Sequence, residues 1–165
     1  MDLYLVRHAS AFDPDQTQWP TDRDRPLTPD GEKRFLRAAK GLASVVSSVD
    51  AMLSSPYARA WRTAELLAEA GWPAPVECEA LEAGRSPADA LQALQEYRRS
   101  ASVALVGHEP AMHELVSYLL TADAGHAQVE FRKGAVARLE LDELRPGGAI
   151  LRWLLAPKIL RGLAD

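Results

Sequence analysis

The sequence has almost no cysteine, since Cys78 is the only one, and no disulfide can therefore form within the chain. It also lacks a long hydrophobic run: no apolar stretch approaches the ~20 residues that a helix needs to cross a bilayer. Nothing near the first residue resembles a signal peptide, because Arg7 and His8 interrupt the only early apolar run. Internal repeats and low-complexity segments are also missing. These absences make a cytoplasmic protein without membrane contact the default expectation.

An excess of basic charge is missing as well. The chain carries 19 basic and 23 acidic residues, for a net charge of −4. This balance leaves no electrostatic footprint for nucleic acid, so we expect no nucleic-acid partner. A local basic pocket stays open, because the summed charge says nothing about its distribution. The 165 residues, with 47% hydrophobic and 25% charged, suit one domain over residues 1–165. The sequence makes no prediction of oligomeric state.

Strand-like and helix-like segments alternate along the chain. Short apolar runs predict strands at 2–6, 50–54, 75–78, 102–106 and 149–155, and residues 135–142 alternate apolar and polar as an exposed or antiparallel strand does. Helical spacing of apolar residues follows the signals Thr28-Pro29, Ser55-Pro56, Ser86-Pro87 and Pro110, the third of which predicts a helix to about Arg98. This alternation predicts an α/β fold with a parallel or mixed sheet covered on both faces.

The segment 9–27 is long, mostly polar and rich in aspartate and proline. It predicts a loop between the first strand and the first helix. Loops of this length within compact domains are usually functional or disordered.

Three motifs end predicted strands in polar side chains. They are LYLVRH at 3–8, MLSSP at 52–56 with Arg59 just beyond it, and VALVGH at 103–108. The carboxyl ends of parallel strands share one edge of a sheet, and ligands bind in the crevice there. Two arginines and two histidines, separated by about a hundred residues, are therefore expected in one pocket.

Each of these side chains has a chemical use and an ordinary structural interpretation. A neutral imidazole, here His8, is a good phosphoryl acceptor at neutral pH, but a histidine at a strand end often just hydrogen-bonds a loop. Arg7 and Arg59 offer planar donor forks to phosphate oxygens, and Arg59 comes early in its helix, where free N–H groups favour anions. We expect Arg62 nearby to be a solvated surface arginine. His108 could donate a hydrogen bond to a phosphoryl oxygen. It counts as evidence for a phosphate site because it is the second histidine at the same edge of the sheet.

Taken together, these motifs resemble the histidine phosphatase superfamily, also called phosphoglycerate mutase-like. LVRHA at 5–9 is similar to its Arg-His-Gly signature, SSPYARA at 54–60 to its second arginine motif, and VGHEP at 106–110 to its second histidine motif. The stretches 24–31, 133–135 and 156–160 favour the small SixA-type phosphohistidine phosphatases. This resemblance implies a three-layer αβα sandwich whose mostly parallel central sheet has one antiparallel strand.

The resemblance also implies site roles. His8 becomes the phosphoryl acceptor, and Arg7, Arg59 and His108 become the phosphate pocket. Two departures from the family pattern are Ala9, which replaces a glycine, and Glu109, whose counterpart in this branch is often uncharged. Larger members insert a segment with an acidic proton donor, and here Glu82 is a weak candidate, more readily interpreted as a solvated carboxylate.

The scarcity of acids favours a labile phosphoryl donor, since an imidazole leaving group needs less protonation than an alkoxide. We therefore expect hydrolysis of protein phosphohistidine through a phosphohistidine on His8, with no metal and no cofactor because arginines neutralise the charge. One alternative is a phosphatase of small phosphate esters, with Glu82 or a residue of the 9–27 loop as acid. Another is a phosphate-recognition module without turnover. The last is a metallohydrolase using His8, His108, His113 and His126, none of which have the spacing of a helical metal pair.

Overall fold

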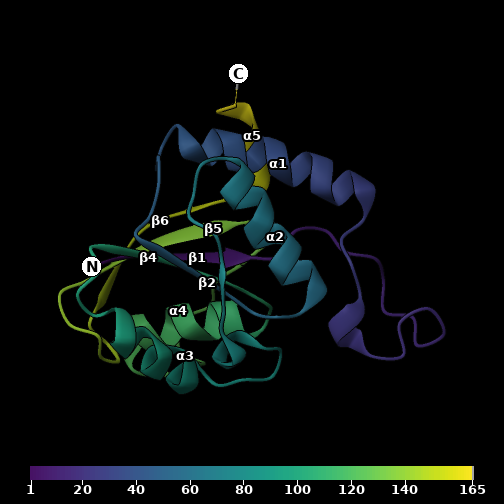
Figure 1. Ribbon diagram of the computed structural model, residues 1–165. Helices are drawn as coiled ribbons and strands as arrows, with labels where there is room; N and C mark the ends of the chain where they lie inside the picture. The colour runs from purple at the N-terminus through teal and green to yellow at the C-terminus, as the bar shows by residue number, and fades with distance from the viewer. Residues whose placement is uncertain (165) are drawn as a thin grey trace.

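Six strands form one mixed sheet in the computed structural model, which describes residues 1–164 (Figure 1). The strand order across the sheet is β3-β2-β4-β1-β5-β6. The strands are β1 Asp2–Arg7, β2 Ala51–Ser54, β3 Val76–Glu77, β4 Ser102–Gly107, β5 Val136–Leu141 and β6 Ala149–Leu155. The helices are α1 Pro29–Ala43, α2 Ala58–Glu69, α3 Pro87–Leu94, α4 Ala111–Thr121 and α5 Pro157–Gly162.

Five of these strands run in the same direction and β5 alone runs against them. β1 and β2 both pair in parallel with β4, β3 pairs in parallel with β2, and β5 is antiparallel to both β1 and β6. The expected mostly parallel sheet with one antiparallel strand is therefore confirmed.

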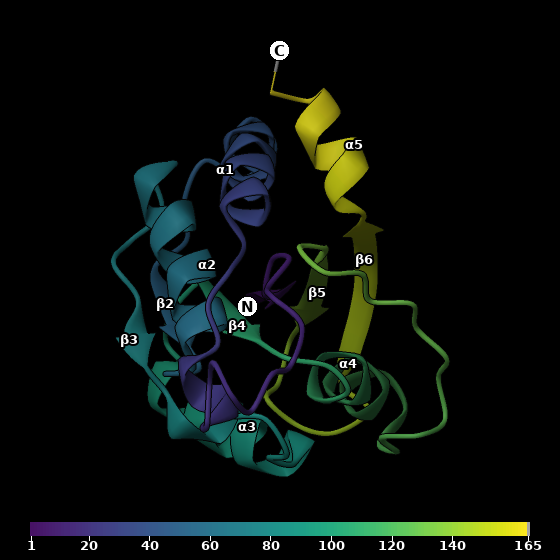
Figure 2. The same cartoon turned by 90° about the vertical axis from the view of Figure 1, so that its right-hand side faces the viewer.

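Helices cover both faces of the sheet, which makes three layers (Figures 1 and 2). β1 shows how this is encoded: Tyr4 and Val6 point into the core beneath α1, α2 and α5, while Leu3 and Leu5 point into the core over α3 and α4. Successive side chains of a strand face opposite sides, so a strand buried on both faces is apolar throughout. Burial of such side chains contributes roughly 1.5–3 kcal/mol each and holds the strand whose end carries His8.

The helix-start signals were mostly correct. Thr28 Oγ1 accepts a hydrogen bond from Gly31 N–H at 3.0 Å, and Ser86 forms a reciprocal capping box with Asp89. The expected start at Ser55-Pro56 was wrong by two residues, since α2 begins at Ala58. The reason is that Ser55 serves another purpose: its hydroxyl contacts the imidazole of His108.

Three further differences concern segment ends. α3 stops at Leu94 and a 3₁₀ turn follows over Gln95–Tyr97, instead of one helix reaching Arg98. α5 was not predicted as a helix, and it packs against α1. The 9–27 segment is a loop, as predicted, but contains a 3₁₀ turn at Asp22–Asp24. Within residues 1–164, no helix has the length and apolar character to cross a membrane.

Candidate active site

The three strand-end motifs meet at one edge of the sheet. Arg7 is in register with Gly107 across β1 and β4, and Ser54 is in register with Val106 across β2 and β4. The backbone continues this alignment, since His8 N–H donates to Gly107 O at 2.9 Å and Ser55 N–H donates to Val106 O at 3.0 Å. The parallel pairing thus brings together side chains that are about a hundred residues apart in the sequence.

His8 is held as a neutral imidazole of defined tautomer. Its Nδ1 lies 2.7 Å from Ala9 O, and because a carbonyl can only accept, Nδ1 carries the proton and Nε2 carries the lone pair. The side chain is buried, with 6% exposure. Burial lowers the pKa of His8 well below 6.5, and the nearby His108, Arg59 and Arg7 lower it further against the opposing hydrogen bond to Ala9. The ring is therefore uncharged at neutral pH.

His108 lies beside His8, with 5.3 Å between the ring centroids. Its Nε2 is 2.8 Å from Ser55 Oγ, and its Nδ1 is buried without a hydrogen-bond partner among residues 1–164. Burial, and after it the charge of Arg59, lowers the pKa of His108 to about 3. The Tyr57 ring closes one side of the site, 5.1 Å from the His108 ring and 5.3 Å from Arg59 Cζ.

Both arginines are anchored through part of their guanidinium groups only. Arg7 Nη1 donates to Phe131 O at 2.7 Å. Arg59 donates from Nη1 to Asp22 O and from Nη2 to Asp22 Oδ2, both at 2.8 Å, and its side chain is 4% exposed. In the described chain, the Nε atoms of both arginines are buried without a partner. Burial lowers the pKa of each, although a guanidinium stays charged at any physiological pH.

The buried nitrogen atoms without a hydrogen-bond partner indicate which ligand the site can bind. An unsatisfied buried polar group costs about 1–3 kcal/mol, so folded chains rarely keep several together without a use. Here Arg7 Nε, Arg59 Nε and His108 Nδ1 lack partners within residues 1–164 and lie at the edge that carries the neutral His8. Two positive charges with free N–H donors suit a tetrahedral oxyanion such as phosphate.

Besides Tyr57, three residues of the site were given no role from the sequence. Asp22 comes from the 9–27 loop and neutralises Arg59. Thr63 joins α2 to the end of β1, because its hydroxyl donates to Arg59 O at 2.7 Å and accepts from Ala9 N–H at 3.0 Å. Ser55 supports His108. Only the length and acidity of the loop pointed toward Asp22; Ser55 and Thr63 lay within or beside the quoted motifs without an assigned role.

Other candidate residues take different positions. Glu82 binds Arg23 at 2.9 Å and is 18% exposed on its side chain, so it is less solvated than expected. His113 pairs through Nδ1 with Glu109 at 2.7 Å. His126 is exposed. Within residues 1–164, no group of three His, Cys, Asp or Glu side chains is arranged to hold a metal ion.

Arg62 differs from the expectation of a solvated surface arginine. Its guanidinium contacts Glu32, Glu65 and Glu69 at 3.0–3.2 Å, and its side chain is 34% exposed. The carboxylates raise its pKa, and the hydrogen bond that Arg62 donates to Glu32 is the largest cause. It therefore links α1 to α2 and lies outside the site.

Comparison with known proteins supports the family that the motifs suggested. A sequence profile of the histidine phosphatase superfamily (branch 1) matches residues 3–83. An uncharacterised protein of Picosynechococcus sp. is 34% identical over 129 residues, covering 76% of this chain and 77% of that protein.

Two solved structures place the fold. The protein histidine phosphatase SixA in complex with tungstate superposes with a TM-score of 0.84 at 26% identity, covering 97% of this chain and 99% of that chain. The α-ribazole phosphatase of Shigella flexneri has a TM-score of 0.68 at 20% identity, covering 95% and 97%, which shows the shared fold alone. The motifs, the edge at which they meet and these similarities together establish that the chain belongs to the histidine phosphatase superfamily, in its SixA-type branch.

Proposed function

We propose that this protein hydrolyses phosphohistidine on a protein, with His8 as the phosphoryl acceptor. The observation that carries the proposal is the tautomer of the neutral His8 ring. Nδ1–H donates a hydrogen bond to Ala9 O, which leaves the lone pair of Nε2 free to attack phosphorus. The uncharged state persists because burial lowers the His8 pKa. A nucleophile in this state is needed for phosphoryl transfer and is not needed for binding alone.

The remaining site residues take roles that follow from their unpaired donors. Arg7, Arg59 and His108 would bind the phosphoryl oxygens through the N–H groups that lack a protein partner. The positive charge of the two arginines and the fixed positions of all three side chains stabilise the charge of an in-line transition state, where positioning and electrostatics supply most of the acceleration. The two arginines neutralise the phosphate, so we propose that turnover needs no metal or cofactor.

The reaction then has two steps. In the first, the His8 Nε2–P bond forms while the substrate's P–N bond breaks. The electron pair leaves on the substrate imidazole, which is released neutral because its other ring nitrogen carries a proton. Because Nδ1 of His8 keeps its proton, the phosphorylated ring is cationic and is itself a good leaving group. In the second step water attacks phosphorus and the Nε2–P bond breaks, with the electron pair returning to Nε2 of His8. The oxygen and both protons of the water leave on the phosphate as H2PO4⁻, and His8 returns to the neutral form.

The leaving group argues for phosphohistidine over a phosphate ester. An alkoxide needs a proton in the transition state, whereas imidazole needs much less help. The acid that the family resemblance suggested, Glu82, is paired with Arg23. SixA, whose structure is similar to this chain, is a protein histidine phosphatase, and this agrees with the proposed substrate class.

We propose that residues 1–165 act as one histidine phosphatase domain; Asp165 lies outside the described part of the chain.

A substrate panel on the wild type and Glu82→Gln tests the proposal. Phosphohistidine peptide and aryl phosphate should be cleaved much faster than alkyl or sugar phosphates, in the presence of a chelator as in its absence. Glu82→Gln should leave the good leaving groups unaffected. Efficient alkyl phosphate turnover that falls by ~100-fold or more in Glu82→Gln would instead identify a small-ester phosphatase with Glu82 as general acid. Phosphate binding without any turnover would identify a recognition module.

A further inference from the structure

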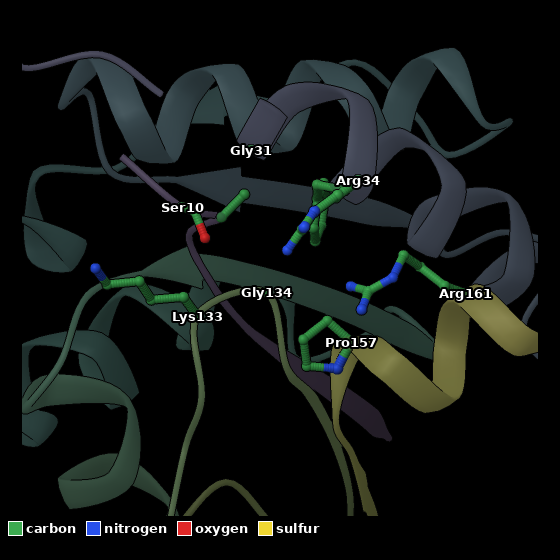
Figure 3. Close-up of a pocket in the computed structure, with 9 residues that line it drawn as sticks. Ser10, Gly31, Arg34, Lys133, Gly134, Pro157 and Arg161 are labelled. Carbon is green, nitrogen blue, oxygen red and sulfur yellow. The ribbon is translucent and has the colours of Figure 1, made fainter. Parts of the chain in front are cut away.

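A second cluster of positive charge lies next to the segment that follows His8. The pocket there is lined by Ala9, Ser10, Gly31, Arg34, Phe35, Lys133, Gly134, Pro157 and Arg161. Three of these residues are cationic and none is acidic, in a chain whose net charge is −4. Figure 3 shows the guanidinium groups of Arg34, from α1, and Arg161, from α5, extending into the same space between Ser10 and Pro157. Lys133 lies across Ser10 from them, and its ammonium group points away from the two guanidinium groups.

The cations of this pocket are poorly neutralised by the protein. Arg34 Nε donates to Asp30 Oδ2 at 2.9 Å, in an ion pair whose two side chains are 64% and 69% exposed. Such an exposed pair contributes little. Within residues 1–164, Arg161 and Lys133 have no hydrogen-bond or ion-pair partner for their side chains. Arg34 and Arg161 bring two like charges into the same space with one exposed counter-charge, Asp30, so an anion bound between them is stabilised.

The floor of the pocket is part of the catalytic segment. Ala9 O accepts the hydrogen bond that sets the tautomer of His8. Gly134 N–H donates to the carbonyls of Arg7 and His8 at 3.1 and 3.0 Å. A side chain at position 31 would collide with Ser10, since a Cβ on Gly31 would lie 2.1 Å from Ser10 O. The pocket is therefore fixed within two residues of the nucleophile and its shape depends on this close approach of α1.

We propose that this pocket, defined by Ser10, Arg34 and Arg161, is a subsite for a second oxyanion carried by the phosphorylated substrate. Arginine forks match the oxygens of a carboxylate or a phosphoryl group, and Ser10 adds a hydroxyl donor. On a protein substrate the occupant is an acidic or phosphorylated side chain near the phosphohistidine. The inference rests on the proposed function only for the identity of the reacting group.

Binding of matched peptides tests the subsite without turnover. Fluorescent peptides with a non-hydrolysable phosphohistidine analogue carry Glu, phosphoserine or Gln at each position within three residues on either side, and anisotropy gives their dissociation constants. At one or more positions the wild type should bind the Glu or phosphoserine peptide about tenfold more tightly than the Gln peptide, since several partly exposed ion pairs add up to this size. A stronger effect of phosphoserine than of Glu would identify a phosphoryl group as the preferred occupant. The preference should weaken at high salt.

Variants locate the preference. Arg34→Gln and Arg161→Gln should each lower it by about threefold while leaving affinity for the Gln peptide unchanged, which also shows that the fold and the phosphate site are intact. Arg99→Gln is the matched control, because Arg99 is exposed and precedes β4, at the opposite edge of the sheet. A wild type without preference at any position, or an equal loss in Arg99→Gln, would overturn the subsite. Cleavage of phosphohistidine peptide is measured separately, so failure of the proposed function is distinguished from failure of the subsite.

Discussion

Arg59 and Arg62 lie three residues apart on α2, yet they belong to regions with opposite electrostatic character. Arg59 is 4% exposed, has a single acidic partner in Asp22 and keeps its Nε without a partner in the described chain. Arg62 is 34% exposed and contacts three carboxylates. Burial lowers the pKa of Arg59, whereas carboxylates raise that of Arg62. One region has donors left for a ligand, and the other has used them to join two helices.

The difference shows that a ligand site is better identified by the unsatisfied hydrogen-bond donors of an arginine than by the mere presence of an arginine. Donors that are already satisfied gain little from a phosphate, while an unsatisfied buried donor regains its lost hydrogen bond when the phosphate arrives. Four experiments test this contrast between the strand edge and the outer face of α1 and α2.

The largest effect is expected for the nucleophile. His8→Ala should lower turnover by at least ~10³-fold, because no other side chain replaces an attacking imidazole. Brief reaction of the wild type with labelled substrate, followed by an alkaline quench, should trap acid-labile phosphate on His8. His126→Ala is the control and should keep full activity, since His126 is exposed outside the site. Label on a serine, or substantial turnover by His8→Ala, would show that the mechanism is wrong.

The comparison of the two arginines comes next. Arg59→Ala should lower kcat/KM by more than ~100-fold, which equals roughly 2.7 kcal/mol at about 1.36 kcal/mol per decade. Arg62→Ala should change kcat/KM little and should instead destabilise the fold by about 1 kcal/mol, because partly exposed ion pairs are weak individually. Steady-state kinetics and denaturant unfolding separate the two. Similar kinetic losses would mean that the pocket has been placed wrongly along α2.

A third effect concerns stability and pH. The folded pKa of His108 is about 3, below the 6.5 of an unfolded histidine, so the unfolded state binds the additional proton. The contribution of neutral His108 to the free energy of unfolding is fully present above pH 6.5. It is lost as pH falls from 6.5 toward 3, with a slope of up to about 1.4 kcal/mol per pH unit. His108→Gln should flatten the decline in unfolding free energy over this window. His126→Gln should leave the decline as it is; an unchanged slope in His108→Gln would show that His108 is not buried as a neutral group.

The smallest effect is expected at Asp22, which occupies the Arg59 fork. Asp22→Asn keeps an acceptor of the same shape but removes the negative charge that competes with phosphate, so KM should fall by about threefold with little change in kcat. Asp24→Asn, on the same 3₁₀ turn and exposed, is the matched control. An increase in KM for Asp22→Asn would indicate that the carboxylate positions Arg59 for binding and does not compete with the substrate.

Much of this architecture could be predicted locally. Apolar runs identified β1, β2 and β4 because strands buried on both faces leave an unmistakable pattern, and Thr28-Pro29 located the start of α1 because capping depends on neighbours within four residues. From parallel strands it then followed that Arg7, His8 and His108 share an edge, which the register confirms. The roles of these residues stay predictions until the kinetic tests above are made.

The tertiary structure alone decided which groups are paired. Asp22 reaches Arg59 across 37 residues of sequence, and Arg62 reaches Glu32 across 30. No local pattern encodes such contacts, since they depend on how a long loop and two helices pack around the sheet. The same holds for the pocket between α1 and α5, where Arg34 and Arg161 converge from distant parts of the chain. Residue types and their strand-end spacing thus determined the chemistry available to this protein, while long-range packing determined which donors remain free to perform it.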